Sequence, residues 1–191
     1  MLPAPGPTDP APPPPPGRLD RLDRDASRRV AVDWPHPVWF TVPLGGLSLS
    51  ANYGLLWYLV ALLPWLAGEP QPLTRFLFVA VPVTLAEALG YLVKHFVGRL
   101  RPPVADPTLL RQIPLPISKS FPSSHASMAA VGALSVGALY PAALPALIAV
   151  AAVLCFSRVY LGVHYIGDVL GGLLLGLVVG GLWLALVPAP G

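Results

Sequence analysis

The sequence predicts an all-α fold, a polytopic bundle of about five transmembrane helices behind a disordered, proline-rich N-terminal tail. Of its 191 residues, 54% are hydrophobic and only 11% are charged, and the mean hydropathy is +0.66. One small core cannot bury that much apolar surface, so a lipid bilayer is the natural solvent for the excess. The order of segments agrees, because long apolar runs follow the proline-rich start.

The N-terminal segment differs in composition from the rest of the chain. Residues 1–17 are mostly proline and alanine, which disfavour helix and offer nothing to pack, so we expect disorder there. Residues 18–33 mix arginine with aspartate and are compatible with a short surface helix. No secretory signal precedes the first apolar run. We therefore predict a largely disordered tail over residues 1–33 and a membrane-embedded domain over residues 34–191.

The apolar runs set the number of spans, since crossing the hydrocarbon core takes about 20 residues of helix. The five candidate spans are residues 46–67, 73–98, 124–140, 142–161 and 164–187. Close helix packing explains the glycines of the last span without any chemistry. With this number of spans, the long polar loop between the second and third spans lies on the same side as the N-terminal tail.

Three polar clusters fall on that side, and two of them contain lysine or arginine. Lys94 lies near the C-terminal end of the second span, and Pro102 forces Arg101 out of the helical conformation into the loop. Arg158 lies near the end of the fourth span and supplies a forked guanidinium that matches phosphate oxygens. All three cations can therefore point at one anionic group.

The other residues of these clusters open two helices. Ser123, Ser124 and His125 start the third span, where free backbone N–H groups and the helix dipole favour an anion. His164 and Asp168 are four residues apart, so they share a helix face and the carboxylate can hold an imidazole N–H. Phosphoryl transfer to and from a side chain requires such a set: cations to bind the group, one histidine to attack, and another to protonate the leaving oxygen.

Other ligands are less compatible with these clusters. Asp168 is their only acid, so no set of carboxylates or thiolates suggests a metal, and we predict activity with no metal and no other cofactor. The formal charge of +3, with no basic face, argues against nucleic acid. Cys155, the single cysteine, lies in an apolar run and is interpreted as a buried, inert thiol.

The three clusters together resemble the signature of the type 2 phosphatidic acid phosphatase superfamily, the lipid phosphate phosphatases, in its integral-membrane bacterial branch. That signature is Lys, six residues, Arg-Pro; then Pro-Ser-Gly-His; then Ser-Arg, five residues, His, three residues, Asp. Its first and third parts match completely, and the resemblance covers roughly residues 46–187. It implies that His164 is the nucleophile, Asp168 its orienting partner and His125 the general acid. The phosphate-binding residues that it implies are Lys94, Arg101, Ser123 and Arg158.

One position departs from the family pattern, because Ser124 stands where the family has glycine. In relatives that position brings a backbone N–H against the phosphate, where a side chain could crowd. If Ser124 keeps an unstrained backbone, its N–H still serves and its hydroxyl adds a donor. We expect the change to affect rate or substrate range more than reaction type.

Several polar residues have a structural interpretation beside the functional one. Glu87 lies two helical turns before Lys94 inside the second span, where acids are costly and often functional, and both a structural contact and a role in headgroup binding stay open. Ser157 is interpreted as a supporting hydrogen-bond donor and not as a nucleophile. The residues expected to be packed, interfacial or solvated are His36, His95, Arg99, Arg111 and Lys119.

Charge predicts the orientation of the chain in the membrane. Apart from the three phosphate-binding cations, the basic residues on the side of the motifs are Arg18, Arg21, Arg24, Arg28, Arg29, Arg99, Arg111 and Lys119. Only Arg75 lies opposite. The positive-inside rule then places the N-terminus and the site on the cytoplasmic side of a bacterial plasma membrane.

The composition, rich in Ala, Pro, Gly and Arg, is typical of a GC-rich bacterial genome. Together with a cytoplasmic site, it favours a polyprenyl-linked phosphosugar such as decaprenylphosphoryl-5-phosphoribose as substrate. Undecaprenyl diphosphate and phosphatidylglycerophosphate are the alternative substrates. A vanadate-dependent haloperoxidase would share the pocket, although its relatives are soluble, and a non-catalytic lipid-binding or transport protein would keep the motifs without turnover. The oligomeric state is not predicted.

Overall fold

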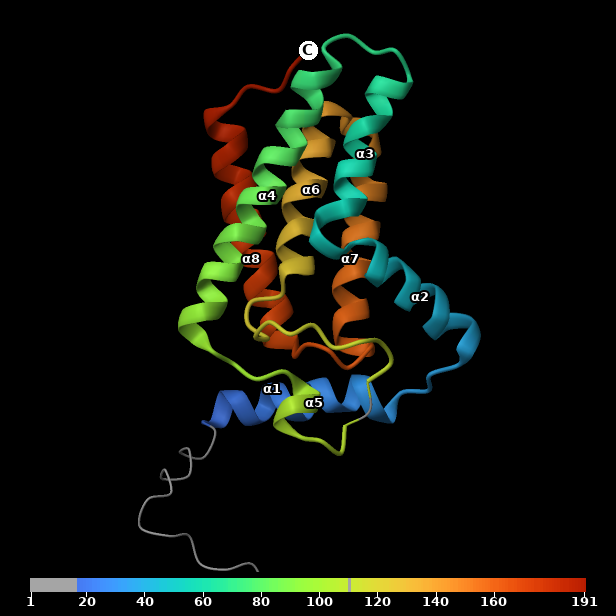
Figure 1. Cartoon of the computed structure of the whole chain (residues 1–191), viewed down its shortest axis with the longest axis vertical. Coiled ribbons are helices and arrows are strands. Elements are labelled where there is room, and N and C mark those ends of the chain that lie inside the picture. Colours follow the sequence, from blue (N-terminus) through green and yellow to red (C-terminus); the bar gives the residue numbers. More distant parts are fainter. Residues whose placement is uncertain (1–16, 110) are drawn as a thin grey trace, which may run out of the picture.

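The computed structural model describes residues 17–109 and 111–191, and their regular structure is entirely helical (Figure 1). The all-α prediction is confirmed. Residues 1–16, nearly all of the proline-rich segment predicted to be disordered, lie outside the described residues.

The helices form a bundle with one helix lying across its end. In chain order they are α1 (Arg18–Arg28), η1 (Arg29–Asp33), α2 (Val38–Ser50), η2 (Asn52–Gly54), α3 (Leu55–Leu66), α4 (Pro72–Val97), α5 (Pro102–Ala105), α6 (Ser124–Leu139), η3 (Pro141–Ala143), α7 (Leu144–Tyr160) and α8 (Ile166–Leu186). The bundle consists of α3, α4, α6, α7 and α8, and α1 crosses its lower end (Figure 1).

Three helical segments, Pro72–Ala105, Pro141–Tyr160 and Ile166–Leu186, are long and apolar enough to cross a membrane. Helices α2 and α3 together would make a fourth span, and α6 is apolar but has only 16 residues. The expected membrane bundle is therefore present, and the count of about five holds if the short α6 is included.

The first expected span, residues 46–67, is not one continuous helix. Instead α2 starts earlier, at Val38, and meets α3 at a bend of 59°. The bend lies at Asn52–Gly54, where Tyr53 and Gly54 both have positive φ angles of 54° and 76°. A left-handed backbone interrupts the helical hydrogen bonds, and glycine tolerates it without a steric cost.

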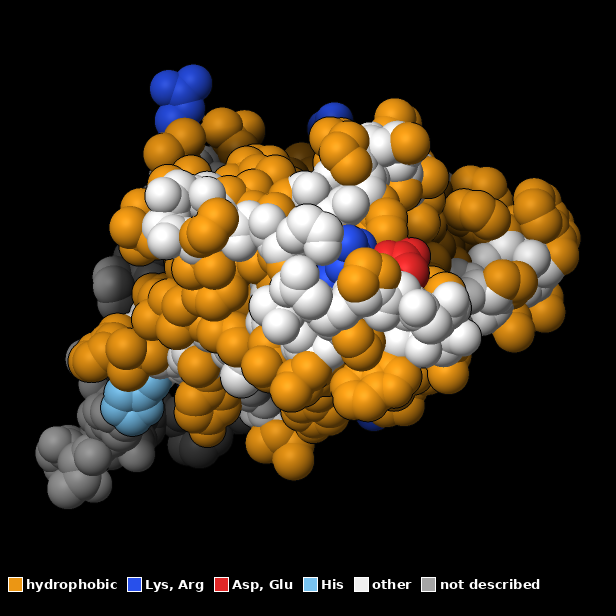
Figure 2. All heavy atoms as spheres, turned by 90° about the horizontal axis from the view of Figure 1, so that it is seen from above, with side chains coloured by type: hydrophobic (Ala, Val, Ile, Leu, Met, Phe, Trp, Pro, Cys, Tyr) orange, Lys and Arg blue, Asp and Glu red, His pale blue; other side chains and the backbone are white. Residues whose placement is uncertain are grey.

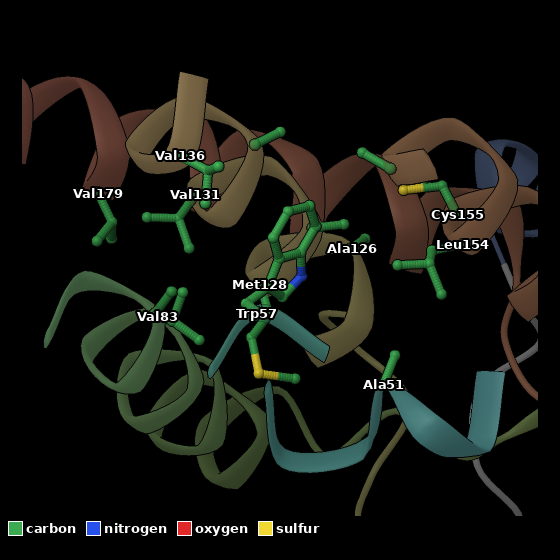
Figure 3. Close-up of a cluster of buried hydrophobic side chains, with 14 of the residues drawn as sticks. Ala51, Trp57, Val83, Ala126, Met128, Val131, Val136, Leu154, Cys155 and Val179 are labelled. Carbon is green, nitrogen blue, oxygen red and sulfur yellow. The ribbon is translucent and has the colours of Figure 1, made fainter. Parts of the chain in front are cut away.

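The core surrounds α6, which packs against α4, α7 and α8. At the centre of this core lies Trp57 of α3, which is 1% exposed and packs among Val83, Met128 and Val131 (Figure 3). The indole lies against Gly132, where a Cβ would come within 2.2 Å of the ring. The core thus joins the bent segment to the central helix.

The glycines of α8 allow close packing on α6, as their spacing indicated. A Cβ at Gly172 would lie 2.3 Å from the carbonyl oxygen of Ser123, and one at Gly176 would lie 2.2 Å from that of Ser127. Only a residue without a side chain permits this approach. The start of α6 is therefore held directly against α8, which carries Asp168.

The two ends of the bundle differ in charge. Seen from the end opposite α1, Figure 2 shows mostly hydrophobic and uncharged side chains, with a basic and an acidic group side by side near the middle and further basic groups at the rim. At that end Arg75 forms an ion pair of 2.9 Å with Glu69, and both hydrogen bond to Tyr140. The titratable residues of the sequence motifs lie at the other end, because they fall at the end of α4 and α7 and at the start of α6 and α8.

Candidate active site

A cavity of about 520 Å³ lies at the ends of α4, α6 and α7, and the loop before α6 and the bend after α2 complete its wall. Among the residues that line it, the predicted site residues are Lys94, Arg101, Ser124, His125, Arg158, His164 and Glu87. Asp168 lies directly behind His164. The three sequence motifs, which lie far apart along the chain, therefore meet at one pocket.

The imidazole of His164 lies between a cation and a carboxylate. Its Nε2 is 2.8 Å from Nη1 of Arg101, and its Nδ1 is 3.4 Å from Oδ2 of Asp168. A guanidinium can only donate hydrogen bonds, so Nε2 accepts, and the ring proton resides on Nδ1. This tautomer leaves a lone pair on Nε2, so this nitrogen can act as a nucleophile.

Burial and charge keep this imidazole neutral. His164 is 2% exposed and lies outside the spanning helices, between α7 and α8. Burial first, and then the cations Arg101 and Arg158, hold the pKa of His164 well below its usual value of 6.5. The neutral base is thus the prevailing form at physiological pH.

Asp168 is fully buried and has its hydrogen-bonding capacity filled. Its Oδ2, which faces Nδ1 of His164, accepts a hydrogen bond from the hydroxyl of Ser120. It also accepts one from the backbone N–H of Tyr165 at 2.9 Å. Its Oδ1 accepts from Nη1 of Arg99 at 2.9 Å. Held on both oxygens, the carboxylate has a defined orientation toward the imidazole.

Arg101 is immobilised from three directions. Its Nε donates to the carbonyl of Ser118 at 2.8 Å, Nη2 donates to the Ser118 hydroxyl at 3.2 Å, and Nη1 donates to the carbonyl of Val163 at 2.9 Å. The prolines after Arg101 start the short α5 and leave Arg101 itself in an extended conformation, as expected. The guanidinium is 4% exposed and is presented to the cavity in one position.

His125 and Arg158 share a partner in Ser48, at the end of α2. The Ser48 carbonyl accepts a hydrogen bond of 3.0 Å from Nε2 of His125, and the Ser48 hydroxyl accepts one from Nη1 of Arg158. A carbonyl accepts only, so Nε2 of His125 carries a proton. Nε of Arg158 is buried and has no partner among the described residues, which leaves it available to an anion.

The start of α6 adds backbone donors to the cavity wall. Ser123 precedes the helix, and no side chain caps the N–H groups of its first turn. Ser124 has an ordinary helical backbone, because the described non-glycine residues with positive φ are Tyr53 and Gln71 alone. The condition stated for a serine at the family's glycine position is therefore met. Lys94 is 4% exposed and donates to the carbonyl of Pro122, just before this turn.

Two predicted residues do not reach the cavity. The Ser157 hydroxyl donates to the carbonyl of Leu154 in its own helix at 2.6 Å, so it is a structural contact. The Ser123 hydroxyl is buried with no partner among the described residues, and its backbone N–H donates to the carbonyl of Asp168 at 2.9 Å. Ser123 therefore joins α6 to α8, beside the cavity.

The expectation of a solvated Arg99 is wrong. Its side chain is 16% exposed and pairs with Asp168, Asp20 and Asp23. The expected short helix over the charged segment is present as α1, and its aspartates supply these pairs. Sequence spacing gave no sign of the contact, because the acids of α1 lie 76 and 79 residues from Arg99 along the chain.

Other residues around the cavity also escaped sequence analysis. The serines that hold the site are Ser48, Ser118 and Ser120. The bend after α2 places Asn52 and Tyr53 on the cavity wall. The Asn-Tyr-Gly sequence was the available signal, since asparagine and glycine favour left-handed turns. Among the described residues, no group of three or more His, Cys, Asp and Glu side chains could hold a metal ion.

Comparison with known proteins agrees with this arrangement. Residues 72–190 match the PAP2 superfamily. The chain is similar to a Mycobacterium tuberculosis protein named decaprenylphosphoryl-5-phosphoribose phosphatase, with 33% identity over 131 residues, 69% of this chain and 71% of that protein. It is also similar to an undecaprenyl-diphosphatase of Sulfolobus acidocaldarius, with 37% identity over 100 residues, 51% of this chain and 48% of that protein.

Among solved structures, the fold resembles that of the transmembrane PAP2-type phosphatidylglycerolphosphate phosphatase from Bacillus subtilis. The TM-score is 0.71 and the sequences are 25% identical, with 88% of this chain and 85% of that chain covered. The similarity thus extends over nearly the whole bundle.

Proposed function

Because the chain belongs to the PAP2 superfamily and is a membrane-embedded phosphatase, we propose that it removes the terminal phosphate of a polyprenyl-linked sugar phosphate through a phosphohistidine on His164. The observation that carries the proposal is the environment of this imidazole. It is neutral and buried, it has an Asp168 carboxylate beside Nδ1, and it has a lone pair on Nε2 at the wall of a cationic cavity.

In the first step, Nε2 of His164 attacks phosphorus and the bond from phosphorus to the leaving oxygen breaks. The proton on Nδ1 stays toward Asp168, which stabilises the positive charge that develops on the ring. His125 gives a proton to the leaving oxygen, so the lipid departs as a neutral alcohol. Since Nε2 of His125 donates to Ser48, we assign this transfer to its other nitrogen, Nδ1. The ring therefore enters this step with a proton on both nitrogens, a form that the bound anionic phosphate stabilises.

In the second step, water attacks the phosphohistidine. His125, now neutral at Nδ1, takes a proton from the water as the P–N bond breaks. Inorganic phosphate leaves and both imidazoles return to their starting states. Both halves use Nδ1 of His125: the proton that it gives to the alcohol is replaced by one from the attacking water, so no further acid or base is needed.

The phosphate oxygens would be held by three cations, Lys94, Arg101 and Arg158, with the backbone N–H of Ser124 beside them. Fixed positive charge aimed at the transferring group is the task that metal ions perform in other phosphatases. We therefore propose activity without a metal. An excess of a chelator should leave the rate unchanged, and loss of activity that Mg²⁺ or Zn²⁺ restores would refute this part.

Glu87 favours a phosphosugar over a diphosphate. Its side chain lines the same cavity, has no hydrogen-bond partner among the described residues, and lies on α4 on the order of 10 Å before Lys94. A carboxylate at this depth repels a second phosphate but accepts hydrogen bonds from sugar hydroxyls. A ribose between the terminal phosphate and the lipid would present such hydroxyls, as in the named substrate of the mycobacterial relative.

For the location, we propose the plasma membrane of a bacterium, with the N-terminus and the cavity on the cytoplasmic side. Support comes from the exposed arginines at this end, such as Arg18, Arg21 and Arg28, against Arg75 at the other. A reporter fused at Gly191 tests it. An external C-terminus is expected, and a cytoplasmic one would overturn the orientation.

The assay that tests the function is phosphate release by purified protein from a panel of lipids without metal. The panel holds decaprenylphosphoryl-5-phosphoribose, undecaprenyl diphosphate and phosphatidylglycerophosphate. Decaprenylphosphoryl-5-phosphoribose should give the highest kcat/KM. His164→Ala should abolish turnover. His95→Ala, which replaces an exposed histidine on α4, should not. Lipid binding without release by the wild type would instead indicate the non-catalytic class.

Replacement of Glu87 separates the substrate choice from the reaction. Glu87→Gln should lower kcat/KM for the phosphoribose lipid on the order of tenfold. It should raise kcat/KM for the diphosphate, because a charge that repels the second phosphate is lost. An equal effect on all lipids of the panel would leave Glu87 a structural role only.

A further inference from the structure

Helix α1 contacts the machinery around Asp168 through one cation, Arg99. Nη2 of Arg99 donates to Oδ1 of Asp20 and to Oδ2 of Asp23, at 2.7 Å each. Nη1 donates to Oδ1 of Asp168 at 2.9 Å. The guanidinium also lies over the ring of Tyr165, 4.2 Å from its centroid. Arg99 therefore bridges α1 and the buried carboxylate.

The same face of α1 binds the start of α8. Oδ1 of Asp23 accepts from the backbone N–H of Gly167 at 2.8 Å, and the Ser27 hydroxyl accepts from that of Ile166 at 2.8 Å. These N–H groups belong to the first turn of α8 and have no partner within the helix. Asp23 thus contacts both Arg99 and the helix that carries Asp168.

Arg99 is the cation that the three carboxylates of this network share. Although burial opposes it, hydrogen bonds from Arg24 and Arg99 lower the pKa of Asp20, so this side chain remains ionised at neutral pH. The Asp168 side chain is fully buried, and Arg99 is the partner of its Oδ1 among the described residues. Without Arg99 that oxygen would be a buried, unpaired acceptor, and the carboxylate would be oriented toward His164 through Oδ2 alone.

We propose that Arg99 is a positioning residue for the phosphatase reaction, and that α1, through Asp20 and Asp23, holds it against Asp168. The N-terminal helix is then part of the support of the active site, and its docking on the bundle end sets the rate of phosphoryl transfer. The inference rests on the proposed role of Asp168 as the partner of His164. It extends that role to a segment outside residues 72–190, the part that matches the superfamily.

The test compares Arg99→Gln, Asp23→Asn and the double variant, in detergent or lipid vesicles, on whichever lipid the wild type hydrolyses. Arg99→Gln should lower kcat on the order of 10²-fold with little change in KM, because orientation is lost and the phosphate-binding cations remain. Asp23→Asn should lower kcat by a smaller factor. If Asp23 acts through Arg99, the double variant should be no slower than Arg99→Gln alone.

Arg111→Gln is the matched control, because Arg111 is exposed and lies in the same loop. Vanadate, an analogue of phosphate, should bind Arg99→Gln about as tightly as it binds the wild type, which separates a positioning role from a collapsed site. Wild-type kcat in Arg99→Gln, or independent, multiplying losses in the double variant, would overturn the proposal. Should Arg99→Gln fail to fold, a wild-type kcat in folded Asp23→Asn would refute it equally. A wild type that hydrolyses none of the lipids would instead refute the proposed function.

Discussion

Nη1 of Arg101 lies 2.8 Å from Nε2 of His164, so the cation occupies the direction from which the imidazole lone pair would attack. A phosphoryl group entering between them would take over this hydrogen bond with one of its oxygens. The guanidinium would then stabilise the transferring group at the point where the new bond forms. The contact explains how one residue can both hold the nucleophile ready and bind its target.

Arg101→Lys should therefore be severely impaired although it conserves the charge. Lysine cannot reproduce the three contacts to Ser118 and Val163 and still face His164, because its ammonium is a single point. We expect kcat/KM to fall on the order of 10²- to 10³-fold. Steady-state phosphate release measures it, with Arg111→Lys as the control. A loss below about tenfold would show that charge alone suffices at this position.

Ser48→Ala tests the support that sequence analysis missed. The substitution removes the hydroxyl that accepts from Arg158 but keeps the carbonyl that accepts from His125. Arg158 then loses a buried partner, which should weaken vanadate binding on the order of 5- to 10-fold. Ser50→Ala, two residues further along α2 and exposed, is the control. Unchanged vanadate affinity in Ser48→Ala would remove Ser48 from the phosphate site.

The protonation state of His164 gives a pH prediction. Its pKa is held well below 6.5 by burial and by the neighbouring cations, so the ring stays neutral as the pH falls through that value. ¹⁵N NMR of histidine-labelled protein should therefore show a neutral ring with the proton on Nδ1 from about pH 8 to about pH 6. A resonance assigned through His164→Ala that titrates near 6.5 would contradict this.

Gly176→Ala tests the close contact between α8 and α6. A methyl group there would lie 2.2 Å from the carbonyl oxygen of Ser127, so the helices must separate. We expect a loss of about 1–3 kcal/mol in unfolding free energy, measured by thermal or denaturant unfolding in detergent. Gly181→Ala is a strict control, because a Cβ there meets nothing within 4 Å. Equal stability of the two variants would show that the contact is not tight.

The sequence alone was sufficient to place several motif residues at one end of the helix bundle. Lys94, Arg101, His125, Arg158 and His164 could be placed together because helix ends alternate between the two sides of a membrane. Their spacing also marked which residues open or close a helix. These arguments depend on local sequence and on span counting, and in the structure the five residues line one cavity.

Features that depend on contacts between distant segments could not be predicted in this way. Ser48 touches His125 and Arg158 only because the backbone bends at Tyr53 and Gly54. From the sequence, Arg99 could not be distinguished from other loop arginines, because its acidic partners Asp20 and Asp23 lie in α1. In both cases one partner lies in a segment without a motif, so its role becomes visible only when the helices are packed.

The central claim is the covalent step at His164, and trapping the intermediate tests it most directly. The protein is mixed with its lipid substrate, quenched in base within a single turnover, digested and analysed by mass spectrometry. We predict a phosphoryl group on the peptide that contains His164, removed by acid and absent from His164→Ala. Full turnover by the wild type with no phosphoryl group on this histidine, or turnover that survives His164→Ala, would contradict the account.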